Sequence, residues 1–180
     1  MRPHFIYNTM TSIYYLCSQN AKLAQKVMFD FTNYLRKNFM AIACKGTILF
    51  SEELEHTKAY LAIEQAQFEE NLFVKYDTPH KNFNIPPLTL QPIVENSVKH
   101  GLDPDSDPLH ILISTRKIEK GNVIIVEDDG IGFEIDNDGE NFALKNIQKR
   151  LEMFCRGTLS IYPRKDGGTV EKIFIPSAQK

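Results

Sequence analysis

Gln91-Pro92-Ile93-Val94-Glu95-Asn96-Ser97-Val98-Lys99-His100-Gly101 follows a proline pair and predicts a helix over residues 88–100. The glycine suits the end of that helix. Within little more than one turn it carries four polar side chains: Glu95, Asn96, Lys99 and His100. Residues three or four apart share a helix face. An amide oxygen beside a carboxylate suits Mg²⁺, and a lysine suits phosphate charge. For this helix taken alone, an ordinary solvated face is the commoner explanation.

A second stretch, Val126-Glu127-Asp128-Asp129-Gly130-Ile131-Gly132-Phe133, predicts a strand that runs into an Asp-Asp-Gly-x-Gly turn. A carboxylate at a strand end can accept a hydrogen bond from an exocyclic amine, and glycines let the backbone approach a flat ring closely. A hairpin turn explains the same residues about equally well, because Asp-Gly is a common turn pair. A third stretch, Asp166-Gly167-Gly168-Thr169, is by itself a tight turn before a strand.

The rest of the second half alternates strands with helices. We expect strands at residues 72–77, 110–117, 123–128, 158–163 and 169–175, and a further helix at residues 144–154. Residues 134–141 are acidic and have no periodicity, which predicts a mobile loop. This order is typical of an α+β fold in which helices cover one face of a mixed sheet.

The first 70 residues have a different pattern. Apolar residues recur at alternating spacings of four and three, interrupted only by the polar Asn20: Ile6, Met10, Ile13, Cys17, Ala24, Val27, Phe31 and Tyr34. This heptad pattern predicts one long helix over residues 4–40. Ser51 is the expected N-cap of a second helix that ends near Asn71.

The two expected helices would form a hairpin that exposes an apolar stripe. Two copies of such a hairpin bury their stripes in a four-helix bundle, so the pattern predicts a homodimer. The chain is therefore expected to divide into a dimerisation region over residues 1–70 and a second domain over residues 71–180.

Composition argues against several classes of protein. Lys and Arg number 21 against 23 Asp and Glu, so no basic surface for nucleic acid is expected. The cysteines Cys17, Cys44 and Cys155 are far apart and form no CxxC pair, which favours a reduced cytosolic compartment without a zinc site. No apolar run reaches the roughly 18 residues needed to span a bilayer, so no membrane span is expected within the chain.

The three polar stretches occur in a fixed order, with Phe142-Ala143-Leu144-Lys145-Asn146-Ile147 between the second and the third. In this order they resemble the GHKL ATPase superfamily, whose Bergerat fold binds ATP beneath a lid. The resemblance implies that Asn96 holds Mg²⁺, with Glu95, Lys99 and His100 around the phosphates. It also implies an adenine site in which the Asp128 carboxylate bonds the amine, beside Gly130, Gly132 and Thr169. Ala143, which stands where the family usually has glycine, and Leu144 complete the expected ATP-binding set, since backbone amides at a helix N-terminus suit phosphate.

Arg2-Pro3-His4-Phe5-Ile6-Tyr7-Asn8-Thr9-Met10 resembles the Pro-His-Phe-Leu-Phe-Asn-Thr-Leu signature of LytS/YesM-type sensor histidine kinases. Residues 52–55 and 60–68 resemble the second helix of that family. The resemblance implies that His4 is the phospho-acceptor and that Asn8 and Glu95 assist the chemistry. It further implies an enzyme that uses ATP and Mg²⁺ to phosphorylate His4 and then passes the phosphate to a response regulator. The parent protein would be anchored in the plasma membrane, with this part in the cytoplasm.

Without the resemblance, His4 is most simply a solvated surface histidine, although a neutral imidazole is a competent nucleophile. Pro3 could begin the helix or kink it. Because the helix begins so close to His4, its first turn is expected to fray. Two other functions stay open. One is a GHKL ATPase or a protein-serine kinase of anti-sigma type, and the other is a degenerate module that only dimerises and docks a partner.

Overall fold

The computed structural model describes residues 3–44, 46–68, 70–102, 107–132 and 140–177. The bounds of the helices are α1 Pro3–Gln19, α2 Ala21–Ala43, α3 Phe50–Gln67, α4 Leu90–Gly101 and α5 Glu140–Cys155. The bounds of the strands are β1 Ile48–Leu49, β2 Leu72–Asp77, β3 Asn84–Ile85, β4 Leu109–Ile118, β5 Gly121–Asp128, β6 Thr158–Pro163 and β7 Thr169–Pro176. Most of the expected acidic loop, together with the side chain of His4, lies outside the described part.

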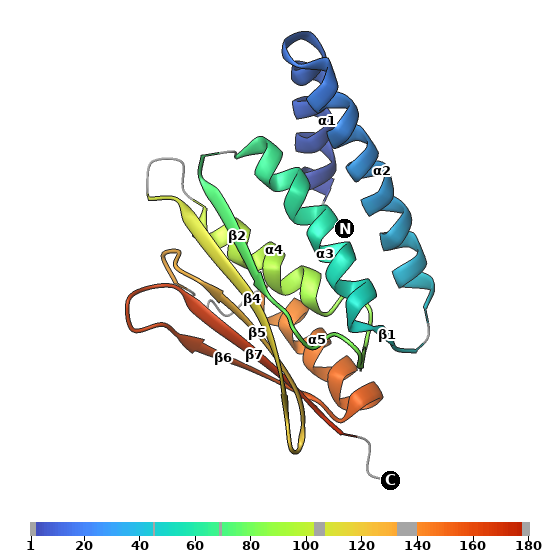
Figure 1. The fold of residues 1–180 in the computed structure, drawn as a ribbon, viewed down its shortest axis with the longest axis vertical. Helices are drawn as coiled ribbons and strands as arrows, with labels where there is room; N and C mark the ends of the chain where they lie inside the picture. Colours follow the sequence, from blue (N-terminus) through green and yellow to red (C-terminus); the bar gives the residue numbers. More distant parts are fainter. Residues whose placement is uncertain (1–2, 45, 69, 103–106, 133–139, 178–180) are drawn as a thin grey trace.

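The prediction of one long N-terminal helix is wrong, because the chain reverses at Asn20. This residue leaves helical geometry (φ −148°, ψ 82°), and its side-chain oxygen accepts the N–H of Leu23 at 3.1 Å as the N-cap of α2. Asparagine favours this position because its short side chain satisfies a free backbone N–H at a helix start. The reversal makes α1 and α2 an antiparallel pair, which extends beyond the sheet in Figure 1.

Aromatic side chains hold the α1–α2 pair together. The ring centroid of Phe5 lies 6.2 Å from that of Phe31 and 5.1 Å from that of Tyr34. Edge-on ring contacts of this kind are favourable beyond the area they bury. Helix α1 begins at Pro3, as suits a proline in a first helical turn. The hairpin is therefore formed within residues 3–43, and α3 is a third helix.

Helix α3 begins one residue before its expected N-cap, so the prediction for Ser51 is wrong. Leu49 occupies the cap position without a side-chain cap, and the N–H of Phe50 donates to the carbonyl of Phe83 at 2.8 Å. The cause is a short ladder that the sequence did not suggest, in which β1 pairs with β3. The helix ends at Gln67, earlier than the expected Asn71.

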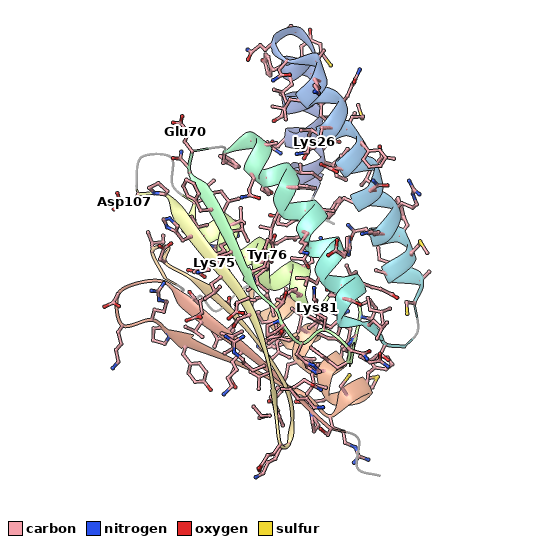
Figure 2. All side chains as sticks on the ribbon, viewed as in Figure 1. Lys26, Glu70, Lys75, Tyr76, Lys81 and Asp107 are labelled. Atoms are coloured by element: carbon pink, nitrogen blue, oxygen red, sulfur yellow. The ribbon has the colours of Figure 1, made fainter. Side chains whose placement is uncertain are left out.

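Helix α3 packs against both the first and the second half of the chain. It lies against α2 on one side and against α4 and β2 on the other. The ammonium of Lys58 in α3 lies 5.3 Å from the ring centroid of Tyr76, a β2 residue labelled in Figure 2. The division of the chain at residues 70 and 71 stays a prediction.

The second half is the expected α+β fold. Five strands form one sheet in the order β2-β4-β5-β7-β6, in which only the β2–β4 pair is parallel. Helices α4 and α5 pack on one face of the sheet, behind it in the view of Figure 1. The predicted strands are confirmed, with β2 and β6 matching at both ends. In β2 every second residue is more buried than its neighbours, as in a strand with one face toward a core. Among the described residues, no helix is both long and apolar enough to cross a membrane.

Candidate functional site

A small pocket joins the three polar stretches that the sequence singled out. It lies where the face of α4, the end of β5 and the start of β7 meet. Its lining residues are Asn96, Ser97, His100, Gly101, Asp128, Gly132, Thr169 and Glu171. Asn96, His100, Asp128, Gly132 and Thr169, all predicted site residues, are therefore neighbours in space although they come from segments up to 73 residues apart (169 − 96).

Asp128 is held in a defined orientation at the end of β5. Its side chain is buried, and Oδ1 accepts the N–H of Gly130 at 3.2 Å and that of Thr169 at 3.1 Å. Burial raises the pKa of Asp128, and these two N–H groups oppose the rise because they favour the carboxylate. The result is a preorganised acceptor inside the pocket, of the kind that an exocyclic amine requires.

Glycine is necessary at two places beside Asp128. A Cβ on Gly130 would lie 2.4 Å from the Cα of Gly101, which is at the end of α4. Gly168 has φ +90°, and a Cβ there would lie 2.0 Å from the Asp128 carbonyl oxygen. Both separations are far below van der Waals contact, so any side chain would push these backbones apart. The close approach sets the position of α4 relative to the Asp-Gly turn.

Helix α4 presents its predicted site residues to two different places. Asn96 and His100, one turn apart, line the small pocket. Glu95 and Lys99, also one turn apart, line a separate cavity of about 240 Å³ between α4, α3 and α1. These four side chains were expected to surround one ligand. The structure divides them into two pairs, because residues one apart point to different sides of a helix while residues four apart share a face.

The cavity between the helices brings Asn8 of α1 to Glu95 and Lys99 of α4. Its other lining residues include two polar side chains of α3, Glu64 and Gln67. Burial raises the pKa of Glu64, and the charge of Glu95 adds to the rise. Asn8 lies one helical turn after His4, so the N-terminal turns of α1 are next to the polar face of α4.

Buried hydrogen bonds connect α2 with this same face. Gln91 Nε2 donates to the Tyr34 hydroxyl at 2.8 Å and also to Glu95 Oε1, which lies 3.5 Å from the Tyr34 hydroxyl. Burial raises the pKa of Tyr34, and the negative charge of Glu95 raises it further. Tyr34 therefore stays a neutral phenol, which positions the Glu95 carboxylate.

Ala143 and Leu144 lie in the first turns of α5, which begins four residues earlier than the expected start at Leu144. Leu144 is buried in the core and Ala143 is half-buried. Neither belongs to the described lining of the small pocket. Their contribution to nucleotide binding stays a prediction.

Several known proteins similar to this chain are named as sensor histidine kinases. A family model described as "Histidine kinase" matches residues 1–72. YwpD of Bacillus subtilis is 35% identical to this chain, and the alignment covers 99% of this chain and 68% of YwpD. The sensor histidine kinase YesM of the same organism is 31% identical over 98% of the chain. The chain belongs to the sensor histidine kinase family.

Solved structures agree with this assignment at the level of the fold. The kinase chain superposes on the histidine kinase domain of the Erythrobacter litoralis EL346 blue-light activated kinase with a TM-score of 0.59. That match has 15% identity and covers 97% of this chain and 94% of the other. The catalytic domain of the histidine kinase ThkA gives a TM-score of 0.57 at 15% identity, covering 72% of the kinase chain and 95% of ThkA.

The kinase chain corresponds to only part of the named sensor proteins. It spans 32% of YesM and 28% of the sensor protein LytS of Oceanobacillus iheyensis, with which it shares 33% identity over 84% of its own length. Statements about the activity and partners of a whole sensor protein are therefore proposals for this kinase.

Three buried carboxyl groups, those of Glu53, Glu64 and Glu171, were not predicted as site residues. Glu171 lines the small pocket, and Glu53 lies fully buried in α3. A signal for Glu171 was present, because alternation along β7 places it on the same face as Thr169 and Ile173. No local pattern marks Glu53, because its partners lie at least 35 residues further along the chain.

Proposed function

We propose that this chain is the dimerisation and catalytic part of a sensor histidine kinase, and that it transfers the γ-phosphoryl group of ATP to His4. The observation that carries the proposal is the pocket that joins Asn96, Asp128 and Thr169. A response regulator would then accept the phosphoryl group on an aspartate. The parent protein would be anchored in the plasma membrane, with this part in the cytoplasm, by analogy with sensor kinases such as YesM.

The chemistry of the pocket fits a nucleotide with a bound divalent ion. The buried Asp128 carboxylate would accept a hydrogen bond from the exocyclic amine of adenine. The side-chain amide of Asn96, also buried in the pocket, supplies the hard oxygen that Mg²⁺ prefers. When bound, Mg²⁺ would neutralise charge on the phosphates. His100 on the same helix face, Gly130, Gly132 and Thr169 complete the proposed ATP site.

Phosphoryl transfer would take place at the cavity between α1 and α4. A ring nitrogen of His4 would attack the γ-phosphorus, forming an N–P bond while the bond to the ADP oxygen breaks and ADP leaves with the electron pair. The Glu95 carboxylate would accept the proton that the imidazole releases. Asn8 and Lys99 line the same cavity, so they would hold the transferred group in place. Most of the acceleration of phosphoryl transfer would come from holding the His4 ring and the γ-phosphoryl group in the correct relative position.

A His4→Gln variant should lose more than about 100-fold of its phosphate incorporation, because the nucleophile is removed. The measurement is acid-labile label on the protein after incubation with γ-labelled ATP. Binding of ATP should stay within about twofold, because the pocket is separate from α1. A His110→Gln variant is the matched control, since His110 contacts Asp129 on the surface, and it should label normally.

Two outcomes would contradict the proposal. Unchanged labelling of His4→Gln would remove His4 from the mechanism. Steady phosphate release without any acid-labile phosphoprotein would instead indicate an ATPase or a serine kinase. Absence of nucleotide binding in calorimetry would indicate the non-catalytic module.

A homodimer formed through α1 and α2 belongs to the same proposal. The outer face of α1 exposes Tyr7, Met10 and Tyr14 at helical spacing. That of α2 likewise exposes Met28, Phe39 and Ile42. Apolar stripes of this length on adjacent helices are usually covered by another helix pair. The predicted seam residues Val27, Phe31 and Tyr34 are instead used within the chain, against α1 and α3.

A Tyr14→Glu/Phe39→Glu double variant should therefore be monomeric at concentrations where the natural chain has twice the chain mass in light scattering. Charges in an apolar interface remain without partners, which disfavours association strongly. Tyr162→Glu is the control, because Tyr162 is an exposed aromatic on β6, the edge strand opposite β2, whereas β2 is the strand that contacts α3. A double variant that remains dimeric would place the interface elsewhere.

A further inference from the structure

Glu171 occupies a position on β7 that normally belongs to the core. Residues 169, 171, 173 and 175 are buried while their neighbours are more exposed, so Glu171 points toward the helices. In the sheet it pairs with Val126 of β5, one layer below the level of Asp128 and Thr169. Its side chain is 5% exposed and lines the small pocket together with those two residues.

The carboxyl group of Glu171 is incompletely satisfied. Its Oε2 atom is buried and has no hydrogen-bond partner among the residues that the structure describes. The groups that share the pocket with it are Asp128 of β5, Thr169 of β7, and Asn96, Ser97 and His100 of α4. A buried polar atom without a partner is costly, so a ligand group that bonds to it would lower the free energy of the pocket.

Glu171 is expected to be uncharged at neutral pH. Burial raises its pKa to about 8, and the nearby Asp128 carboxylate contributes to the rise. A neutral carboxylic acid carries one O–H donor, whereas Oδ1 of Asp128 is held as an acceptor by the N–H groups of Gly130 and Thr169. The pocket therefore combines one acceptor with one donor at neighbouring positions of adjacent strands.

That combination matches one edge of adenine. The ring carries an exocyclic amine, which donates, with a ring nitrogen on either side of it, and each of these nitrogens only accepts. Phosphate is a poor match for the pocket, because its oxygens accept hydrogen bonds and offer no donor to the accepting Oδ1 atom of Asp128. Guanine is also a poor match, because the carbonyl oxygen that it carries in place of the amine would face the Asp128 carboxylate.

We propose that Glu171 is a second base-reading residue of the nucleotide pocket, where its carboxyl group donates a hydrogen bond to the adenine ring nitrogen beside the amine that Asp128 binds. This inference rests on the proposed function, since it requires that the pocket takes ATP. It makes Glu171 a specificity-determining residue whose unsatisfied oxygen is completed by the base.

The test compares ATP with two analogues, 1-deaza-ATP and 7-deaza-ATP, each of which lacks one of the two candidate ring nitrogens. Calorimetry on the full chain should show that the natural protein binds one analogue about tenfold more weakly than ATP, as the loss of one buried hydrogen bond implies. In Glu171→Leu the same analogue and ATP should bind within about twofold of each other. Glu171→Gln can still donate and should keep the preference.

The Leu variant is expected to fold, because it replaces a buried unsatisfied carboxyl by an apolar group of similar size, and its Tm should be equal or higher. A preference that survives unchanged in Glu171→Leu would overturn the inference, as would the absence of any preference in the natural protein. These outcomes differ from failure of the proposed function itself, in which the natural chain would bind no ATP at all.

Discussion

Replacing Glu53 by alanine is expected to lower the free energy of unfolding by about 3–5 kcal/mol, the range for breaking a buried charged cluster. Glu53 is fully buried in α3, and its carboxylate accepts the backbone N–H groups that precede and begin α4. The donor distances are 3.0 Å for Leu88, 2.8 Å for Thr89, 2.9 Å for Leu90 and 3.4 Å for Gln91. A carboxylate at this place also complements the helix dipole.

A cation from α5 completes this arrangement. The guanidinium of Arg150 donates to the carbonyl oxygens of Pro87 and Leu88, in the segment that Glu53 holds from the other side. Burial raises the pKa of Glu53, and the four N–H groups oppose the rise. Removing the carboxylate therefore leaves buried N–H donors without acceptors and a half-buried positive charge without compensation.

Glu52→Ala is the matched control for Glu53→Ala, because Glu52 lies in the same first turn of α3 but is exposed. Its effect should stay within about 0.5 kcal/mol, as for surface substitutions in general. Chemical denaturation of both variants gives the comparison. ATP affinity should fall only in Glu53→Ala, because Glu53 positions the helix that carries Asn96. An equal loss of unfolding free energy in the two variants would show that the hydrogen bonds of Glu53 to the start of α4 do not cause the destabilisation.

An Asp128→Asn variant is expected to weaken ATP binding roughly 100-fold. The loss combines a charge-assisted hydrogen bond to the adenine amine with the orientation that Gly130 and Thr169 impose on the carboxylate. An asparagine in the same place would have to satisfy those two N–H donors with its single oxygen, which directs its own N–H₂ group at the amine. Two donors facing each other repel, so the variant would disfavour the adenine amine and not only lose one hydrogen bond to it.

Asp129→Asn is the control, because the neighbouring carboxylate faces away from the pocket. Asp129 accepts the backbone N–H of His110 at 2.7 Å and contacts its ring nitrogen Nδ1 at 2.9 Å on the surface. Its substitution should change the ATP dissociation constant by less than about threefold in calorimetry. If Asp129→Asn were as damaging as Asp128→Asn, the Asp-Gly turn as a whole, and not the buried carboxylate, would determine binding.

Local patterns were sufficient for most of the second half. Strand-forming stretches bounded by turn residues predicted β2 and β6 at their observed ends, and in β2 every second side chain is more buried than its neighbours. Five lining residues of the small pocket, Asn96, His100, Asp128, Gly132 and Thr169, belong to the stretches that the sequence singled out, because glycines and polar side chains at strand and helix ends are a local signal. The one-helix prediction for residues 4–40 was wrong because a heptad pattern continues through a reversal when both helices bury the same kind of face.

The sequence by itself determined the elements of the second half, five lining residues of the small pocket and the resemblance to sensor histidine kinases. Side chains repeat their direction every 2 residues in a strand and every 3.6 residues in a helix, so both patterns appear among neighbouring positions of the chain. Turn residues are a local signal in the same way. Only the tertiary structure decided that Asn20 reverses the chain, that Glu53 caps α4 and that Glu171 enters the pocket. Each of these depends on which distant segment lies opposite, and that choice is made by the burial of many side chains together rather than by any local pattern.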